Sequence, residues 1–358
     1  MPRIVIAAGG TAGHVVPALA VADALRERGA EVEFVGGERA EAELVPAAGY
    51  PFHPLRVEGI DRRNVARASR AALLAARAAL QARGVLRRLG ARAVLGGGGY
   101  VAGPVGLAAR ALGLPLVLTE ADSHLGVTNR LLAPFAERVF LAFPIEGRTE
   151  PKWVVSGRPV PAGTGTADRE AARERFGIGQ GQACVLVFGG SLGARRLNEA
   201  ALDAFGAAAP GAVLHASGRR DHDDMRRRLD ALGSPPHYHL HPYIEPFADA
   251  LAAADLAVAR AGGGVQELLV AGLPAVLVPY PHATADHQTK NARWAEAAGA
   301  AVVVPDKELD GPRLGREVGE LLGAPQRMAE MANAAEAAAR PDAAERIADE
   351  LMELAGRD

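Results

Sequence analysis

The sequence predicts an α/β protein made of two similar domains, each with a parallel β-sheet, that face one cleft. Two segments carry this prediction. Residues 3–20 have the pattern of a buried strand, a glycine turn and the first turns of a helix, and residues 185–195 repeat it. Strands and helices alternate along the chain at a spacing that favours parallel sheets with helices on both faces. The 358 residues are enough for two domains of ordinary size.

Composition narrows the class of protein. Apolar residues make up 49% of the chain, which favours packed cores over disorder. The net charge of −2 argues against a nucleic-acid partner bound through overall charge. No stretch of about 18 apolar residues occurs, and no apolar leader with a cleavage site precedes the first strand, so we expect a cytoplasmic protein. The single cysteine, Cys184, lies in an apolar strand and is expected to be a buried thiol.

The first half of the chain alternates regularly between strands and helices. After the first loop, a helix is expected over residues 17–28. Further strands are predicted at residues 31–35, 52–57, 92–95, 116–119, 138–142 and 153–156, and further helices at 41–48, 64–89 and from about 128. A second glycine-rich turn, residues 96–104, opens another helix.

Residues 157–165 are rich in proline and glycine, which is typical of a linker between domains. Beyond them the pattern predicts a helix at 167–176 and strands at 183–188, 212–215, 237–240, 255–259, 274–278 and 300–304. Residues after about 311 are expected to be helical, and the last helix, about 342–354, to pack back on the first domain. The predicted domains are therefore residues 1–160, with the C-terminal helix at about 341–358, and residues 165–340.

The helix predicted at residues 64–89 carries an arginine stripe. At 100° per residue, four arginines lie within roughly 80° of one another, flanked by leucines. The stripe is either a solvated face beside a core face or a surface that rests on anionic lipid. The four arginines are Arg67, Arg70, Arg77 and Arg88, and the leucines are Leu73, Leu74 and Leu80.

A third glycine loop joins a strand to a helix at residues 259–269. Its free backbone N–H groups and the helix N-terminus could receive a diphosphate. Glu267 lies in the first turn of that helix, where it could accept hydrogen bonds from a ribose diol or only complement the helix dipole. Gln288 follows a strand end, where α/β sheets bind ligands, and its amide suits sugar hydroxyls; on its own it is equally an ordinary helix-surface residue.

In the first loop, His14 is the candidate general base because imidazole titrates near neutral pH. Its other possible role is structural, with the imidazole tying the loop to neighbouring backbone. Glu120 and Asp122, just past a strand end, are the second-choice candidates, as carboxylates of the acceptor site.

Other chemistries lack their motifs. The Gly-x-Gly-x-x-Gly fingerprint is missing from the glycine loops of the first half and the linker, and no Gly-Lys-Ser/Thr phosphate loop exists. The histidines have no metal-ligand spacing and one cysteine cannot build a zinc site. A Gly-x-Ser-x-Gly elbow is absent, which leaves a hydrolase triad unsupported.

Four motifs occur in a fixed order, and Glu267, residues 271–274 and residues 291–292 belong to the same set. The whole set resembles the MurG family of N-acetylglucosaminyltransferases. The resemblance covers nearly the whole chain. The motifs are residues 9–20 (GGTAGHVVPALA), 98–104 (GGYVAGP), 189–195 (GGSLGAR) and 286–288 (DHQ).

The resemblance implies a GT-B fold, with two Rossmann-like domains on either side of a cleft. It also implies transfer of GlcNAc from UDP-GlcNAc to the C4 hydroxyl of MurNAc in lipid I, which yields lipid II for peptidoglycan synthesis. In the family this transfer inverts the anomeric centre and needs neither a metal nor another cofactor. Lipid I is membrane-bound, so the family resemblance places the enzyme as a peripheral protein on the cytoplasmic face of the cell membrane, in a process that serves cell shape and division.

Residue by residue, His14 matches the family's motif histidine, and His14 and Glu120 are the candidate catalytic residues. Asn129 matches a sugar contact, Ser191 a phosphate contact, and Ile244 a backbone contact to uracil. Glu267 matches the ribose-binding glutamate and Gln288 a GlcNAc contact. The remaining candidate substrate-binding residues are Thr11, Ala12 and Gly13, near the donor, and Gly263 and Gly264, whose backbone amides could replace a side-chain phosphate contact.

The sequence departs from the family pattern at three places. Ala12 stands where the family has a second glycine, and Pro161 stands where it has an arginine. Arg158 is a candidate for the missing charge. The segment from Arg260 to Glu267 is one residue shorter than in the family. Two other functions remain open at this stage: another GT-B nucleotide-sugar enzyme such as a UDP-GlcNAc 2-epimerase, and a non-catalytic nucleotide-sugar-binding protein.

Overall fold

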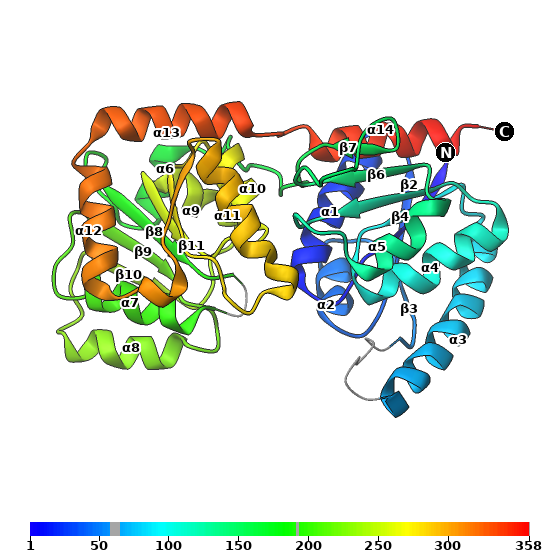
Figure 1. The fold of residues 1–358 in the computed structure, drawn as a ribbon, viewed down its shortest axis with the longest axis horizontal. Coiled ribbons are helices and arrows are strands. Elements are labelled where there is room, and N and C mark those ends of the chain that lie inside the picture. Colours follow the sequence, from blue (N-terminus) through cyan, green and yellow to red (C-terminus); the bar gives the residue numbers. More distant parts are fainter. Residues whose placement is uncertain (58–64, 191–192, 358) are drawn as a thin grey trace. The chain divides into compact units, whose positions relative to one another are not determined.

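The computed structural model describes the backbone of residues 1–57, 65–190 and 193–357, and their side chains except those of residues 65–73. Two compact units are formed, Met1–Pro161 with Arg340–Asp358, and Ala162–Ala339 (Figure 1). Each unit is a parallel sheet with helices packed on it, so the predicted fold class is confirmed.

The first unit contains a seven-stranded sheet of order β3-β2-β1-β4-β5-β6-β7, with every strand parallel to its neighbours over the residues described. Its strands are β1 (Arg3–Ala7), β2 (Glu31–Gly36), β3 (Phe52–Pro54), β4 (Ala93–Gly96), β5 (Leu116–Glu120), β6 (Arg138–Leu141) and β7 (Trp153–Val155). Its helices are α1 (Ala12–Glu27), α2 (Ala40–Ala47), α3 (Val65–Leu89), α4 (Gly99–Leu112), α5 (Val127–Leu132), η1 (Ala133–Phe135) and α14 (Ala343–Ala355).

Side chains that alternate along β1 separate two cores. Ile4 and Ile6 point into a cluster formed with α1, α2 and α14, whereas Val5 and Ala7 point into one formed with α3, α4 and α5. Helix α14 packs on α1, and its Ile347, Leu351 and Leu354 are buried there.

The second unit has a six-stranded parallel sheet of order β10-β9-β8-β11-β12-β13. Its strands are β8 (Cys184–Phe188), β9 (Ala212–Ala216), β10 (Tyr238–His241), β11 (Leu256–Ala259), β12 (Ala275–Leu277) and β13 (Ala301–Val303). Its helices are α6 (Arg169–Arg175), α7 (Arg195–Phe205), α8 (His222–Ala231), α9 (Phe247–Ala253), α10 (Gly264–Val270), η2 (Thr284–Asp286), α11 (His287–Ala297), η3 (Asp306–Glu308), α12 (Gly311–Leu322) and α13 (Pro325–Ala338). The predicted buried thiol, Cys184, is confirmed.

Both sheets reverse their strand order at the same place. The first strand of each unit, β1 or β8, lies beside the fourth, β4 or β11. Loops that leave two such strands at their carboxyl ends diverge and leave a crevice, which is where open α/β sheets bind ligands. The glycine loops of the sequence follow these strands.

Candidate functional site

In the first unit the loops after β1 and β4 are in contact. A Cβ at Gly99 would lie 2.1 Å from the carbonyl oxygen of Gly9, and the φ of Gly99 is +77°. A side chain is excluded there by both the contact and the backbone conformation. The imidazole of His14 lies against the same turn, since a Cβ at Gly98 would be 2.6 Å from its Cδ2 atom.

His14 lies in the first turn of α1, behind Thr11, Ala12 and Gly13. The Thr11 hydroxyl and Nδ1 of His14 are 3.3 Å apart. Burial lowers the pKa of His14 below its usual 6.5; Asp122 and Glu41 act in the opposite sense, and Arg158 lowers it further. The ring is therefore neutral at neutral pH and can accept a proton.

Glu120 and Asn129 form the next part of this site. Glu120 ends β5, and its Oε2 accepts hydrogen bonds from the Asn129 side-chain amide at 3.0 Å and from the Gly126 backbone at 2.8 Å. The same amide of Asn129 donates to the Thr119 carbonyl at 2.8 Å. Burial raises the pKa of Glu120, while the hydrogen bonds from Gly126 and Asn129 oppose the rise. Glu120 and His14 both line one small cavity, so the fold brings the two candidate catalytic residues together.

Two further residues hold this loop. The sequence prediction missed Glu41, and it named Arg158 only as a candidate for the charge of the missing family arginine. Glu41 of α2 is fully buried and accepts hydrogen bonds from the backbone N–H groups of Gly10, at 2.8 Å, and Gly37, at 2.9 Å. Arg158 donates through Nη2 to the carbonyl of Gly13 at 2.7 Å. The sequence places Glu41 on a predicted helix with no sign that it is buried.

In the second unit, the loop after β8 runs against the loop after β9. A Cβ at Gly193 would lie 2.5 Å from the Ser217 carbonyl oxygen, and the φ of Gly193 is +76°. The candidate phosphate contact Ser191 lies outside the described residues.

The loop after β11 leads through Gly263 into α10, which carries Glu267 in its first turn. Gly264 packs on the Phe188 ring, where an added Cβ would be 2.9 Å from Cε2 and 3.6 Å from Oε2 of Glu267. The carboxylate of Glu267 therefore lies close to the backbone of the glycine turn.

Gln288 lies near the same turn. Its Oε1 accepts a hydrogen bond from the Tyr280 backbone at 2.9 Å, which fixes the side chain. Its Nε2 would be 3.7 Å from a Cβ at Gly262. The structure thus brings Gln288 and the β11 loop together.

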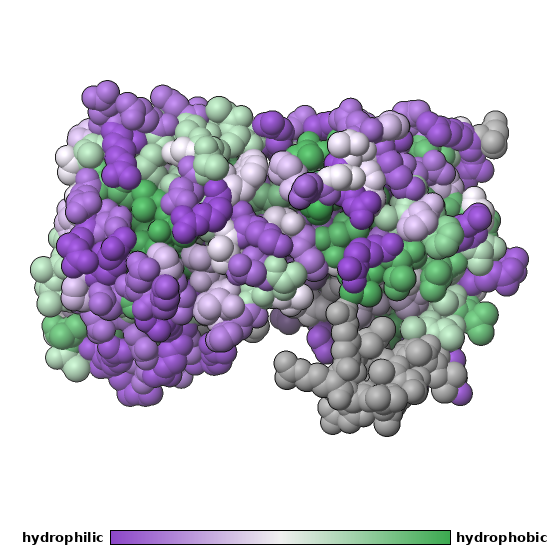
Figure 2. Space-filling view, viewed as in Figure 1, coloured by the Kyte–Doolittle hydropathy of each residue, from purple (hydrophilic) through white to green (hydrophobic). Residues whose placement is uncertain are grey.

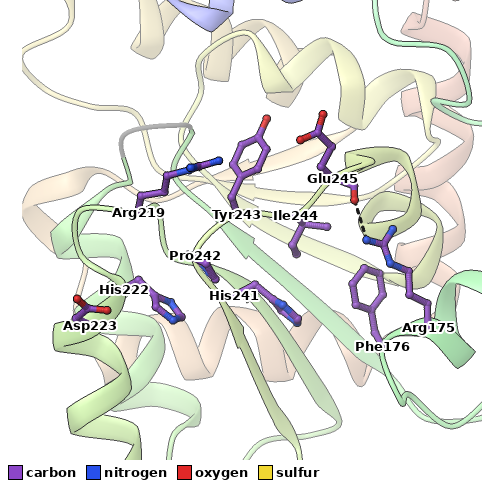
Figure 3. Close-up of a pocket in the computed structure, with 10 residues that line it drawn as sticks. All are labelled: Arg175, Phe176, Arg219, His222, Asp223, His241, Pro242, Tyr243, Ile244 and Glu245. Carbon is purple, nitrogen blue, oxygen red and sulfur yellow. Dashed lines mark hydrogen bonds between the residues drawn. The ribbon is translucent and has the colours of Figure 1, made fainter. Parts of the chain in front are cut away.

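Ile244, in the segment after β10, is buried and lines a pocket of about 690 Å³ (Figure 3). Figure 3 shows Arg219 and Tyr243 on one side of this pocket, and the Arg219 guanidinium lies 5.6 Å from the centre of the Tyr243 ring. Burial, followed by Glu245 and Glu267, raises the pKa of Tyr243, so the segment that carries Ile244 lies within electrostatic range of Glu267. Four candidates of this unit therefore follow strand ends at the carboxyl edge of one sheet: Ile244 in the segment after β10, Gly264 and Glu267 in the first turn of α10, and Gln288 in the first turn of α11.

Metal ligands do not gather in the part of the chain that the structure describes, where no group of three or more His, Cys, Asp or Glu side chains could hold an ion. Among the same residues, none of the helices combines the length and apolar character needed to cross a membrane.

The chain is similar to known glycosyltransferases over nearly its whole length. Residues 4–141 match the glycosyltransferase family 28 N-terminal domain, and residues 184–347 match the family's C-terminal domain. The UDP-N-acetylglucosamine–N-acetylmuramyl-(pentapeptide) pyrophosphoryl-undecaprenol N-acetylglucosamine transferase of Acidithiobacillus ferrooxidans is 44% identical over 370 residues, covering 99% of this chain and 98% of the relative. The chain belongs to the MurG family of glycosyltransferases. A crystal structure of MurG from Acinetobacter baumannii superimposes with a TM-score of 0.78 at 31% identity, covering 99% of this chain and all of that one.

The rival function finds less support. A putative UDP-N-acetylglucosamine 2-epimerase from Listeria monocytogenes superimposes with a TM-score of 0.71 over 97% of this chain and 95% of that chain, but at 17% identity. That likeness shows a shared GT-B fold. The identity to MurG relatives over the full length favours the transferase over the epimerase.

Proposed function

We propose that this MurG family member is an inverting transferase that moves GlcNAc from UDP-GlcNAc to the C4 hydroxyl of MurNAc in lipid I. The observation that carries the proposal is the 44% identity, over 99% of the chain, to an enzyme named for that substrate pair. The positions of His14, Glu120, Glu267 and Gln288 at the carboxyl edges of the two sheets support it.

The first unit, Met1–Pro161 with Arg340–Asp358, is proposed to bind the acceptor. His14 removes the proton of the C4 hydroxyl as its oxygen attacks the anomeric carbon of GlcNAc. The lowered pKa of His14 supports this role, since the neutral imidazole is the form that accepts a proton. Glu120 is the second candidate, and its hydrogen bond from Asn129 fixes the carboxylate beside the same cavity.

The second unit, Ala162–Ala339, is proposed to bind UDP-GlcNAc. The backbone of Ile244 contacts uracil, the Glu267 carboxylate accepts hydrogen bonds from the ribose diol, and Gln288 contacts GlcNAc. Ser191 and the backbone N–H groups of Gly263 and Gly264 receive the diphosphate. Hydrogen-bond donors that are already in place before the reaction stabilise the negative charge that develops on the departing UDP. In the first unit the proposed substrate-binding residues are Thr11, Ala12 and Gly13, which match family positions near the donor, and Asn129, which matches a sugar contact.

We further propose a peripheral position on the cytoplasmic face of the membrane, and a membrane-bound acceptor supports the membrane association. The arginine stripe of α3 is the proposed contact. Arg77 and Arg88 are exposed, and Leu80 keeps 71% of its surface accessible, while the side chains of Arg67, Arg70 and Leu73 lie outside those described. Figure 2 shows hydrophobic surface over α4 of the first unit, where Leu107 is also exposed. Vesicles containing anionic lipid should sediment the wild-type protein, and a variant with Arg77 and Arg88 reversed to Glu should bind them less. Equal binding would refute this surface.

The activity is tested by transfer of radiolabelled GlcNAc from UDP-GlcNAc to a lipid I analogue. We expect a labelled disaccharide lipid and one UDP released per transfer. The matched reaction without acceptor tests the epimerase function, which would form UDP-ManNAc. Binding of UDP-GlcNAc without either product would instead indicate a non-catalytic binding protein.

A further inference from the structure

The first turn of helix α1 lacks one backbone hydrogen bond, because the sequence places a proline where the donor would be. In an α-helix each carbonyl accepts a hydrogen bond from the N–H four residues later. The residue four positions after Gly13 is Pro17, which lies inside α1 and has no N–H. The carbonyl of Gly13, immediately before His14, therefore lacks its usual helical donor.

Arg158 supplies the missing donor from a segment 145 residues away. Its Nη2 lies 2.7 Å from the Gly13 oxygen. The side chain is only 9% exposed and belongs to the segment after β7, between Gly157 and Pro159. A charged donor held in a buried position makes a stronger hydrogen bond than a neutral one. This contact fixes the turn that carries His14 to the end of the first unit's sheet.

The same guanidinium acts on the imidazole through its charge. Arg158, His14 and Glu120 line one cavity. The charged groups that act on His14 are Arg158 on the segment after β7, Asp122 after β5 and Glu41 on α2. Both carboxylates favour the imidazolium form, and among these groups Arg158 is the one that opposes it.

We propose that Arg158 is a positioning residue for His14, holding the first turn of α1 through the Gly13 carbonyl. Its positive charge acts on the imidazole in addition. The inference rests on the proposed function only for His14 being the base of the transfer. Arg158 touches neither the sugar nor the diphosphate in this scheme; it acts through the residue that takes the proton.

The first test is a titration that does not depend on activity. Protein labelled with [¹³Cε1]histidine is titrated by NMR, and the His14 signal among the ten histidines is assigned from its loss in His14→Gln. In Arg158→Met the pKa of His14 should rise, because the opposing positive charge is gone while Asp122 and Glu41 remain. In Arg158→Lys, which keeps the charge, it should stay closer to the wild-type value. An unchanged titration in Arg158→Met would overturn the proposal.

The second test separates the hydrogen bond from the charge. We expect kcat of Arg158→Met to fall about 10- to 100-fold because the base is misplaced. Adding Pro17→Ala restores an N–H that can bond the Gly13 carbonyl, so the double variant should regain part of kcat while the His14 pKa stays raised. Failure to regain any activity would show that the hydrogen bond is not what positions His14.

A matched control is Arg138→Met in the same unit, where Arg138 pairs with Glu350 at 3.5 Å instead of contacting the α1 turn. It should leave the His14 titration and kcat as in the wild type. If the wild-type protein transfers no GlcNAc, the proposed function fails, yet the titration still decides whether Arg158 controls the ionisation of His14.

Discussion

The side-chain carboxylate of Glu41 accepts a hydrogen bond from the backbone N–H of Gly10, with 2.8 Å between Oε2 and the nitrogen. Its other oxygen binds the N–H of Gly37 at 2.9 Å, and the Tyr100 hydroxyl lies 3.3 Å from that oxygen. One buried side chain on α2 thus joins the turns after β1 and β2 to the start of α4. The shape of the loop that leads to His14 is set by this carboxylate as well as by its glycines.

Replacing Glu41 by Gln should loosen that loop. The amide has one acceptor where the carboxylate has two, so one of the two backbone N–H groups loses its partner at a cost of about 1–3 kcal/mol. Hydrogen exchange at Gly10 and Gly37 should become faster in Glu41→Gln. The control is Glu43→Gln, an exposed residue on the same helix. Exchange rates that do not differ between the two variants would contradict the role given to Glu41.

Replacing His14 by Ala should lower kcat by at least about 100-fold, because general bases contribute roughly that much. Donor binding should be kept, since the proposed UDP contacts lie in the second unit. Steady-state transfer and calorimetric titration with UDP-GlcNAc measure the two quantities. His53→Ala, which removes a histidine on β3 that pairs with Glu33, is the control. A His14→Ala enzyme of near-normal rate would end the assignment of the base.

The pH dependence should report the environment of His14. Because burial lowers its pKa below 6.5, the acid limb of kcat/KM should lie below pH 6.5. Asp122 opposes the lowering, so Asp122→Asn should move the limb to still lower pH. The check is kcat/KM for the acceptor measured from pH 5 to 8. A limb that stays in place in Asp122→Asn would indicate that another group titrates.

Glu267→Ala should weaken UDP-GlcNAc binding. Hydrogen bonds to a charged group contribute about 1.5–3 kcal/mol, which corresponds to a rise of roughly 10- to 100-fold in KM for the donor. We expect kcat to change less, because the ribose contact is made in both the ground state and the transition state. Glu330→Ala, an exposed residue on α13, is the control. If the KM for UDP-GlcNAc is unaltered in Glu267→Ala, Glu267 does not bind the ribose and only complements the dipole of α10.

The buried His215 should make the second unit sensitive to acid. Its Nδ1 lies 2.8 Å from the Tyr238 hydroxyl and its Nε2 3.0 Å from Oδ1 of Asn198, and burial lowers its pKa to about 3. Between pH 6.5 and about 3 the unfolded chain binds this proton and the folded chain does not, so stability falls as the pH drops.

The free energy of unfolding should fall by about 1.4 kcal/mol per pH unit through the titration of His215 alone. It is measured by urea unfolding followed through Trp294 fluorescence in a Trp153→Phe background. His215→Gln should show a smaller loss of stability between pH 6.5 and 5 than the parent. Parallel curves for the two proteins would contradict the assignment.

Much of the fold followed from local sequence patterns. The strand predicted at residues 183–188 is β8 (Cys184–Phe188), and the helix predicted at 64–89 is α3 (Val65–Leu89). Buried parallel strands are short apolar runs that glycines end, so their positions are visible in one sequence.

The candidate site could be predicted from the sequence only in part, because its geometry comes from contacts between segments that are distant in the chain. His14 stands out by its place in a glycine loop. Glu41 does not, since a carboxylate on a predicted helix is ordinary at the surface. Arg158 stands out in the sequence only as a candidate for the charge of the missing family arginine, and not as a residue that holds the first turn of α1. One local sign did exist for Arg158: Pro17 leaves the Gly13 carbonyl without a helical donor, and some residue had to supply one.

The return of α14 to the first unit has a consequence for biosynthesis. The apolar side chains of Ile347, Leu351 and Leu354 complete the core beneath α1, yet they are the last part of that core to be translated. The second unit is in effect an insertion within the first. The second unit is therefore fully translated before α14, and until α14 is made the N-terminal sheet exposes the surface that α14 will cover.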